Sequence, residues 1–449
     1  MNNTNRPRQS RILTVVLGLC LLFAWPASLV AEEFSSERGF FIDLPEGYQL
    51  LAEGGANQFV FIGPDQTARL EIKIFDPGRY ASFSAFAEAI KAQLDSRMQY
   101  QSYDYAGRGA RLANFTRGSG AAGVSGHLFL FNQTAAESPF FLVIMSYTVA
   151  SRFDADDDFL RSALDGFSAD GTHRGQPGPI SAAALASLPP GGLQPQRIRF
   201  GEAVIDLAWD PRLAAVAQDL VEREFRVLLP YAEVPELLES AMRRFYRLVY
   251  RQTARGLDEL GLHLSAAWES GAWKGEAWTG VEAPVDQASP AAGAAATRQP
   301  PAGQPTTVPA GAGSVSQASG QPRYGIPAAS RAYVAALLAW TQSFVYERDP
   351  AGSDVVNPLT AAFEQRGDCD SRALVLAILL RQESVDAGVM ISLVHSHALA
   401  MFDVPGLGAR FPYVERQWLV GETTAAVTPG QIAQSQSDIA DWFGITFDY

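Results

Sequence analysis

Cysteine is scarce in this chain, which has only two in 449 residues, Cys20 and Cys369. Exported proteins usually pair their cysteines in disulfides. Cys20 lies in a stretch that we expect to be removed as an export signal, so Cys369 would be the lone cysteine of the mature protein. Because a lone thiol cannot form an internal disulfide, it is either a small core residue or a reactive group.

Basic charge is also in deficit. Lys and Arg number 35 against 48 Asp and Glu, which gives a formal net charge of -13. This balance argues against nonspecific binding to nucleic acid through a basic surface, so no nucleic-acid partner is expected. Beyond the N-terminus the chain has no long hydrophobic run, so no membrane span is expected after signal cleavage.

The N-terminus has the features of an export signal. A basic start with Arg6, Arg8 and Arg11 precedes an apolar core at residues 12–24, and small residues stand at the expected cleavage site. A bilayer-spanning helix needs about 20 apolar residues, so this core favours a cleaved signal peptide over residues 1–31 rather than an uncleaved anchor. We therefore expect an exported protein, either periplasmic or extracellular.

The length of the chain predicts two or three domains, and its mixed patterns predict the α+β class. Within residues 32–170, several short runs alternate apolar and polar residues, and helical patterns begin at Ser82 and in the acidic cluster at 154–158. This order predicts an antiparallel sheet with two helices. The element order and the phrase at 39–45 resemble the small exported domains related to PsbP and Mog1, which implies a binding or docking role.

Two segments rich in Gly, Pro, Ala and Ser separate the remaining parts of the chain. Residues 171–196 predict an interdomain linker, and residues 282–323 predict a disordered one. Between them, residues 197–281 predict a strand at 200–207 followed by helices, which we expect to form the front part of the last domain.

The second of these helices carries several arginines. They follow Pro235, which suits a first helical turn. We interpret them as a solvated face balanced by the acidic remainder of the chain, with an acidic partner as the alternative. The four are Arg243, Arg244, Arg247 and Arg251.

Residues 324–449 carry the strongest pattern. The run at 372–380 is apolar nearly all round and rich in Leu and Ala, which predicts a central buried helix. Gly367 allows a sharp turn before it. Cys369 would therefore lie at a helix N-terminus, where free backbone N–H groups and the helix dipole stabilise a thiolate and can hold an oxyanion.

A nucleophilic thiol also needs a base and a group that orients the base. His395 and His397 both stand at the start of a predicted strand, and their spacing puts them on one face, so periodicity does not choose between them. Glu422 ends a later strand and is the candidate orienting acid, with Asp403 as its rival. For a second oxyanion donor, Trp340 and Gln342 on an upstream helix are the candidates.

The order of Gly-Asp-Cys at a helix start, His-Ala at a strand start and an acid followed by Thr resembles the transglutaminase-like superfamily, in particular its exported bacterial cysteine peptidases. The resemblance implies a papain-like α+β core, with Cys369 as nucleophile, His397 as base and Glu422 as the orienting acid. The family more usually has Asp-Pro-Thr where this chain has Glu-Thr-Thr. Some exported relatives bind calcium through aspartates beside the cysteine. For Asp368 and Asp370 we favour capping of the helix start instead, so no metal or other cofactor is expected.

These features predict an exported thiol-dependent acyl-transfer enzyme, a peptidase or amidase that acts on peptide or glutamine carbonyls through a Cys-His-Glu triad. Its partner would be a protein or peptide substrate. Water as the acceptor would give hydrolysis, and an amine would give cross-linking. The alternative is a non-enzymatic protein that binds a peptide or envelope component on a transglutaminase-like scaffold.

Overall fold

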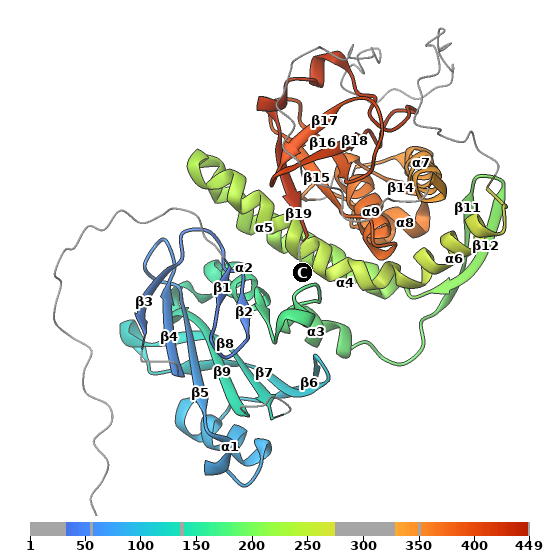
Figure 1. Cartoon of the computed structure of the whole chain (residues 1–449). Coiled ribbons are helices and arrows are strands. Elements are labelled where there is room, and N and C mark those ends of the chain that lie inside the picture. Colours follow the sequence, from blue (N-terminus) through green and yellow to red (C-terminus); the bar gives the residue numbers. More distant parts are fainter. Residues whose placement is uncertain (1–32, 54–56, 135–138, 274–327, 349–351, 448–449) are drawn as a thin grey trace, which may run out of the picture.

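The computed structural model describes residues 33–53, 57–134, 139–273, 328–348 and 352–447 (Figure 1). The expected signal peptide and the expected disordered linker lie outside these residues. No helix in the described ranges is long and apolar enough to cross a membrane.

The N-terminal part is built on a seven-stranded antiparallel sheet with the order β3-β4-β5-β9-β8-β7-β6 (Figure 1). Both faces of the sheet are covered, because neighbouring residues of a strand point to opposite sides. Phe129 and Phe131 of β8 pack toward α2, whereas Leu128 and Leu130 pack toward α1. The strands are β3 Gln49–Glu53, β4 Gln58–Ile62, β5 Arg69–Phe75, β6 Gln101–Tyr105, β7 Arg108–Arg117, β8 Val124–Gln133 and β9 Phe140–Val149.

The helices of this part begin where the sequence predicts. The Ser82 hydroxyl accepts a hydrogen bond from the backbone N–H of Ala85 and caps α1, Phe83–Leu94. The acidic cluster occupies the first turn of α2, Phe153–Asp165, where negative charge suits the helix dipole. A small sheet joins β1 Phe34–Ser35, β2 Phe41–Ile42 and β10 Phe167–Ser168.

The segment 171–196, for which we expected a linker, contains the helix α3, Pro179–Ala186. Asp165, buried at the end of α2, accepts hydrogen bonds from the backbone N–H of Ile180 at 2.7 Å and of Ser181 at 3.1 Å. A side chain 15 and 16 residues before these donors thus supplies the cap of this helix. The composition of the segment does not reveal such a distant partner, so the linker interpretation was too simple.

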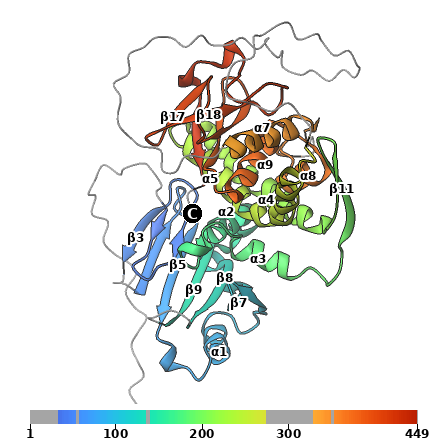
Figure 2. The ribbon, with the colours of Figure 1, turned by 45° about the vertical axis from the view of Figure 1, so that its right-hand side comes forward.

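The rest of the chain surrounds a central helix, α9 (Figures 1 and 2). Its residues from 373 to 380 are fully buried, as the apolar run predicts. A hairpin, β11 with β12, stands where we expected a single strand. The elements are β11 Gln194–Phe200, β12 Ala203–Trp209, α4 Pro211–Leu228, α5 Pro235–Thr253, α6 Asp258–Glu269, α7 Ala328–Gln342, α8 Pro358–Glu364 and α9 Cys369–Gln382.

A five-stranded antiparallel sheet with the order β17-β18-β16-β15-β19 packs on α9. Residues of the β11–β12 hairpin, α4, α5, α7, α8, α9, β15 and β16 belong to one hydrophobic core. The segment 197–273 and the C-terminal segment therefore fold around the same core. The strands are β13 Val345–Tyr346, β14 Arg366–Gly367, β15 Ala387–Ser392, β16 His397–Phe402, β17 Arg410–Tyr413, β18 Arg416–Gly421 and β19 Phe443–Thr446.

Short 3-10 helices join several of these elements and complete the described secondary structure. They are η2 Pro77–Arg79, η3 Gly120–Ala122, η4 Ala150–Arg152, η5 Gly171–His173, η6 Leu229–Glu233, η7 Ala254–Leu257, η8 Gln434–Gln436 and η9 Ile439–Asp441.

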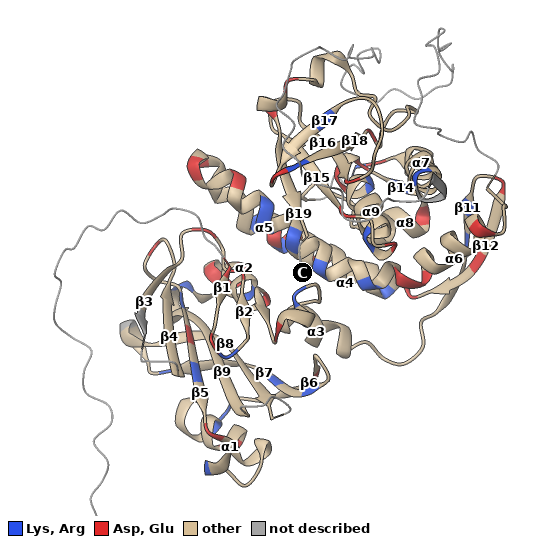
Figure 3. Ribbon diagram, viewed as in Figure 1, with Lys and Arg blue, Asp and Glu red and all other residues tan. Residues whose placement is uncertain are grey.

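The arginines of α5 do not form a solvated face, so that interpretation was wrong. Figure 3 shows α5 running between the two parts of the molecule with basic residues along it. Arg244 is buried and donates to the backbone carbonyl of Asp43 at 2.9 Å and to the Glu224 carboxylate at 3.1 Å. Arg247 donates to the Asp43 carboxylate at 2.8 Å. The acidic partner of this helix is the N-terminal part of the same chain.

Candidate thiol site

The start of α9 is held by a buried aspartate. The Asp368 carboxylate accepts from the backbone N–H of Ser371 at 2.7 Å and from that of Val356 at 2.8 Å. Burial raises the pKa of Asp368 to about 7, with a further contribution from the charge of Asp370. This is the capping role that we favoured for Asp368 from the sequence.

Gly367 is required here for space and not for a left-handed backbone. It is absent from the described glycines with positive φ. A Cβ atom at this position would lie 2.4 Å from the Ser371 hydroxyl oxygen and 3.1 Å from the Ala361 Cβ. The sharp turn that we expected is therefore a close approach between β14 and the first turn of α9.

Cys369 is the first residue of α9 and is 6 % exposed. Its thiol donates to the Asp370 carboxylate at 3.2 Å, and the hydroxyl of Tyr246, from α5, donates to the other oxygen of that carboxylate. Burial, followed by the charges of Asp370 and Asp368, raises the pKa of Cys369 well above its ordinary value. The expected stabilisation of a thiolate is thus outweighed in this conformation.

The strand β16 lies against the thiol. The backbone N–H of Ala398 lies close to the thiol of Cys369 and opposes the rise of its pKa. The residue before Ala398 is His397, the first of β16. The structure therefore places His397 and Cys369 on adjoining elements at one end of α9.

His397 is paired with Glu422. Nε2 of His397 lies 2.9 Å from Oε2 of Glu422, and both side chains are largely buried. Glu422 also accepts from the backbone N–H of Thr424 at 2.6 Å and from its hydroxyl at 2.7 Å. Burial works to raise the pKa of Glu422, but the bonds from His397 and Thr424 outweigh it and lower that pKa.

This pairing assigns the two nitrogens of the imidazole. An ionised carboxylate only accepts hydrogen bonds, so Nε2 of His397 carries the proton. Nδ1 is then the nitrogen that can act as a base. Such an arrangement can take a proton from a thiol and return it to a leaving group.

The alternatives that the sequence left open lie elsewhere. Nε2 of His395 lies 3.2 Å from the Asp441 carboxylate, and His395 precedes the strand. Asp403 is half-exposed and lies 3.4 Å from the Arg416 guanidinium. The structure thus brings Glu422 to His397 and leaves His395 and Asp403 outside the pair.

Both candidate oxyanion donors already donate to backbone carbonyls, so the expectation that Trp340 or Gln342 supplies an oxyanion donor was wrong. Trp340 donates its indole N–H to the backbone carbonyl of Arg199 at 2.9 Å. The side-chain amide of Gln342 donates to the backbone carbonyls of Glu422 at 2.7 Å and of Val427 at 2.8 Å. Gln342 therefore holds the segment that carries Glu422.

Two residues of the site were missed from the sequence. Arg372 is buried and donates to the backbone carbonyls of Gly367 and Thr423, tying α9 to the segment after β18. A charged side chain that is buried with an apolar run needs hydrogen-bond partners, so the position of Arg372 beside this run was a signal that it binds other residues of the site. Tyr246 fits the apolar face of its helix, so no local signal distinguished its hydroxyl.

The carboxylates beside the thiol have protein partners. Asp368 accepts from the start of α9 and from Val356, and Asp370 accepts from Cys369 and Tyr246. Within the part of the chain that the structure describes, no group of three or more His, Cys, Asp or Glu side chains could hold a metal ion.

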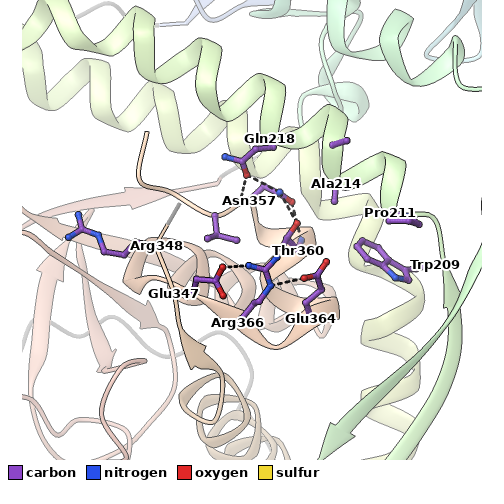
Figure 4. Close-up of a pocket in the computed structure, with 12 residues that line it drawn as sticks. Trp209, Pro211, Ala214, Gln218, Glu347, Arg348, Asn357, Thr360, Glu364 and Arg366 are labelled. Atoms are coloured by element: carbon purple, nitrogen blue, oxygen red, sulfur yellow. Dashed lines mark hydrogen bonds and ion pairs between the residues drawn. The ribbon is translucent and has the colours of Figure 1, made fainter. Parts of the chain in front are cut away.

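A cavity of about 380 Å³ lies beside this site (Figure 4). Arg366, two residues before Asp368, lines it and pairs with Glu347 and Glu364. Gln218 and Asn357 hydrogen-bond to each other on the opposite wall. Cys369, His397 and Glu422 are not among the lining residues, so this cavity and the thiol are separate features.

No protein-family model and no curated protein matches this chain. Several solved structures are distantly similar to it. The solution structure of cyanobacterial PsbP from Synechocystis sp. PCC 6803 has 15 % identity, covers 33 % of this chain and 98 % of its own, and has a TM-score of 0.24. The Ran-binding protein Mog1p of Saccharomyces cerevisiae has 10 % identity, with coverage of 32 % and 98 % and a TM-score of 0.24.

LpqN, which is involved in cell envelope biogenesis of Mycobacterium tuberculosis, has 11 % identity, with coverage of 30 % and 86 % and a TM-score of 0.23. An N-terminal portion of the chain is therefore distantly similar in structure to PsbP and Mog1. These matches carry no information on the thiol site.

Proposed function

We propose that this chain is an exported thiol-dependent acyl-transfer enzyme of the transglutaminase-like type, a peptidase or amidase. One observation carries the proposal. His397, which is largely buried and paired with Glu422, is the first residue of β16, and the backbone N–H of the next residue, Ala398, lies close to the Cys369 thiol. A base and its orienting acid next to a thiol at a helix start are the parts that nucleophilic catalysis requires.

The reaction has two steps. His397 Nδ1 takes the thiol proton, and the Cys369 sulfur attacks the carbonyl carbon of a peptide or glutamine amide. The carbon–nitrogen bond breaks, His397 returns the proton to the leaving amine, and a thioester remains. Water, activated by His397, then attacks the thioester and releases the acid and the free thiol. An amine in place of water gives cross-linking.

The thiol must first leave Asp370. It now donates to that carboxylate, which also accepts from Tyr246. A rotation of the Cys369 side chain about its Cα–Cβ bond exchanges Asp370 for another partner without moving the helix. In this proposal the described conformation is a resting one, in which the thiol is protonated.

The experiment is alkylation of the purified mature protein with iodoacetamide from pH 5 to pH 9, followed by intact-mass spectrometry. Wild type and His397→Ala are compared, with His395→Ala as the matched control. The proposal predicts labelling of wild type and of the control well below pH 8, and a loss of that labelling in His397→Ala. Equal pH profiles for wild type and His397→Ala would contradict it.

A second candidate function is a non-enzymatic binding or adaptor protein on the same scaffold. The raised pKa and the 6 % exposure of Cys369 favour it, because both are typical of an inert core thiol. This candidate predicts slow labelling at every pH below 9 in wild type and in both variants. The alkylation experiment therefore distinguishes the enzyme from the binding protein.

A further inference from the structure

The start of α9 supplies one hydrogen-bond donor for the oxyanion that acyl transfer would form. Cys369 is the first residue of the helix, so its backbone N–H has no acceptor within α9, and it makes no hydrogen bond to another described residue. Oxyanion holes combine such a backbone N–H with further backbone or side-chain donors. A second donor must come from a side chain other than Trp340 or Gln342, because both of these donate elsewhere.

One side chain near the thiol has a donor that is not in use. The Cys369 sulfur lies within electrostatic range of Tyr246, Tyr346 and Arg372. The Tyr246 hydroxyl donates to the Asp370 carboxylate. All three guanidinium nitrogens of Arg372 donate to backbone carbonyls. Of these three side chains, only Tyr346 has no hydrogen bond from its polar group to a residue that the structure describes.

Strand pairing brings Tyr346 to the end of α9 that carries the thiol. β13 and β14 run parallel with Tyr346 opposite Gly367, which stands two residues before Cys369. The backbone N–H of Glu347 donates to the Gly367 carbonyl at 3.2 Å and holds this register. The centre of the Tyr346 ring lies 5.4 Å from the Arg372 guanidinium carbon, which is a cation–π contact that orients the ring.

The phenol of Tyr346 is open to solvent and carries its proton. Tyr346 is 41 % exposed, and its neighbour Val345 is 67 % exposed, so a substrate can approach this strand. Burial of the rest of the side chain, followed by the charges of Cys369 and Asp368, raises the pKa of Tyr346 to about 12. At neutral pH the hydroxyl is therefore a hydrogen-bond donor.

We propose that the Tyr346 hydroxyl is the second oxyanion donor of the thiol site, an inference that rests on the proposed function. When the Cys369 sulfur attacks the carbonyl carbon, the carbonyl oxygen takes the negative charge and accepts from the Tyr346 O–H and the Cys369 N–H. The carbonyl double bond then re-forms, the carbon–nitrogen bond breaks, and His397 gives its proton to the leaving amine. A hydrogen bond to a charged oxygen is stronger than one to a neutral carbonyl, so the contact favours the transition state.

Two electrophiles separate this role from activation of the thiol. Iodoacetamide is attacked at its CH₂ carbon and loses iodide, so no oxyanion forms. p-Nitrophenyl acetate is attacked at its carbonyl carbon, passes through an oxyanion, releases p-nitrophenolate and leaves an acetyl thioester on Cys369. An oxyanion donor therefore accelerates the acetylation and not the alkylation.

The experiment measures both rates at pH 7 on the mature full chain by intact-mass spectrometry. Wild type and Tyr346→Phe are compared, with Tyr413→Phe, at a partly exposed tyrosine of β17, as the matched control. Cys369→Ala corrects for acetylation of other side chains. We expect acetylation of Tyr346→Phe to be at least about tenfold slower than that of wild type, with alkylation within about twofold. Tyr413→Phe should match wild type in both reactions.

The outcomes distinguish this inference from the proposed function. Equal acetylation of wild type and Tyr346→Phe would overturn the oxyanion role and leave acyl transfer standing. A parallel loss of alkylation in Tyr346→Phe would also overturn it, because the hydroxyl would then act on the thiol itself. Slow alkylation of wild type at every pH below 9 would defeat the proposed function and this inference with it. Phenylalanine keeps the ring on Arg372, and thermal unfolding checks that each variant is folded.

Discussion

Burial and the neighbouring carboxylate of Asp370 set the protonation state of the thiol. Asp370 takes the hydrogen bond from Cys369, and its charge contributes to the raised pKa of that thiol. The Tyr246 hydroxyl fixes the same carboxylate from α5. In the proposed mechanism, the reactivity of Cys369 depends on whether the thiol is held by Asp370 or transfers its proton to His397.

Asp370→Asn should make the thiol more reactive. Loss of the negative charge and of the acceptor lowers the pKa of Cys369, so more thiolate is present at any pH below that pKa. We expect the rate of alkylation at pH 7 to rise about tenfold, which corresponds to a fall of about one unit in pKa. Asp219→Asn, at an exposed aspartate of α4, should leave the rate unchanged. A slower rate in Asp370→Asn would contradict the role of this carboxylate.

Glu422→Gln should destabilise the fold in a pH-dependent way. The pKa of Glu422 is lowered in the folded state, so its pair with His397 contributes stability above the unfolded pKa of about 4.3, and this contribution is lost as pH falls through the lowered pKa. We expect the variant to lose about 1–2 kcal/mol of unfolding free energy at pH 7, with the difference from wild type shrinking below about pH 4.

Urea unfolding at several pH values measures this difference. Asp403→Asn is the control, because Asp403 is half-exposed and its ion pair with Arg416 is a surface one. It should cost less than about 1 kcal/mol at any pH. A larger effect of Asp403→Asn than of Glu422→Gln would contradict the expected contribution of the His397–Glu422 pair to stability.

At the scale of elements, the thiol site depends on how α9 begins. Its N-terminus is fixed by Asp368, and its central residues are buried on every side. Strand β14 reaches the helix through Gly367, which has no room for a side chain. The position of Cys369 is therefore fixed by the packing of β14 before it and of the buried helix α9 after it.

Gly367→Ala should disturb this turn. The added methyl group would lie 2.4 Å from the Ser371 hydroxyl oxygen, so the first turn of α9 must shift. We expect a cost of about 1–3 kcal/mol in unfolding free energy, as for other overpacked sites. Gly171→Ala is the matched control, because its Cβ would meet no atom within 4 Å. Equal stability of the two variants in urea would show that the turn can adapt.

At the scale of the whole molecule, α5 joins the two parts. Arg244 and Arg247 reach Asp43 in the N-terminal part, and Tyr246 reaches Asp370 at the thiol site. Burial works to raise the pKa of Asp43, but Arg247 and its neighbours lower it, so this carboxylate stays ionised. The N-terminal part is thus attached through buried, paired charges.

Arg244→Leu should weaken the attachment. The change removes the guanidinium that donates to the buried Asp43 carbonyl and that pairs with the buried Glu224 carboxylate, and breaking a buried pair costs about 3–5 kcal/mol. We expect calorimetry to show a lower unfolding temperature and separate transitions of the two parts. Arg243→Leu, at a more exposed arginine of the same helix, should lower the temperature far less. Similar effects of the two variants would argue against a dominant role of the buried network.

The sequence by itself determined the local features. Periodicity predicted the sheet and the two helices of the N-terminal part, and the apolar run after Arg372 predicted the buried helix α9. Both predictions depend on patterns within a single helix or strand, and such patterns involve only residues that are close together in the sequence. The same holds for the cap at Asp368, because this cap joins Asp368 to Ser371, only three positions away.

Only the tertiary structure decided the partners. It paired His397 with Glu422 and not with Asp403, and it placed Tyr246, 124 residues away in sequence, on Asp370. We expected the arginines of α5 to form a solvated face. In the structure they instead contact a segment about 200 residues earlier in the chain. The physical reason is that hydrogen bonds and ion pairs depend on distance in space, and residues far apart in the chain leave no shared local pattern.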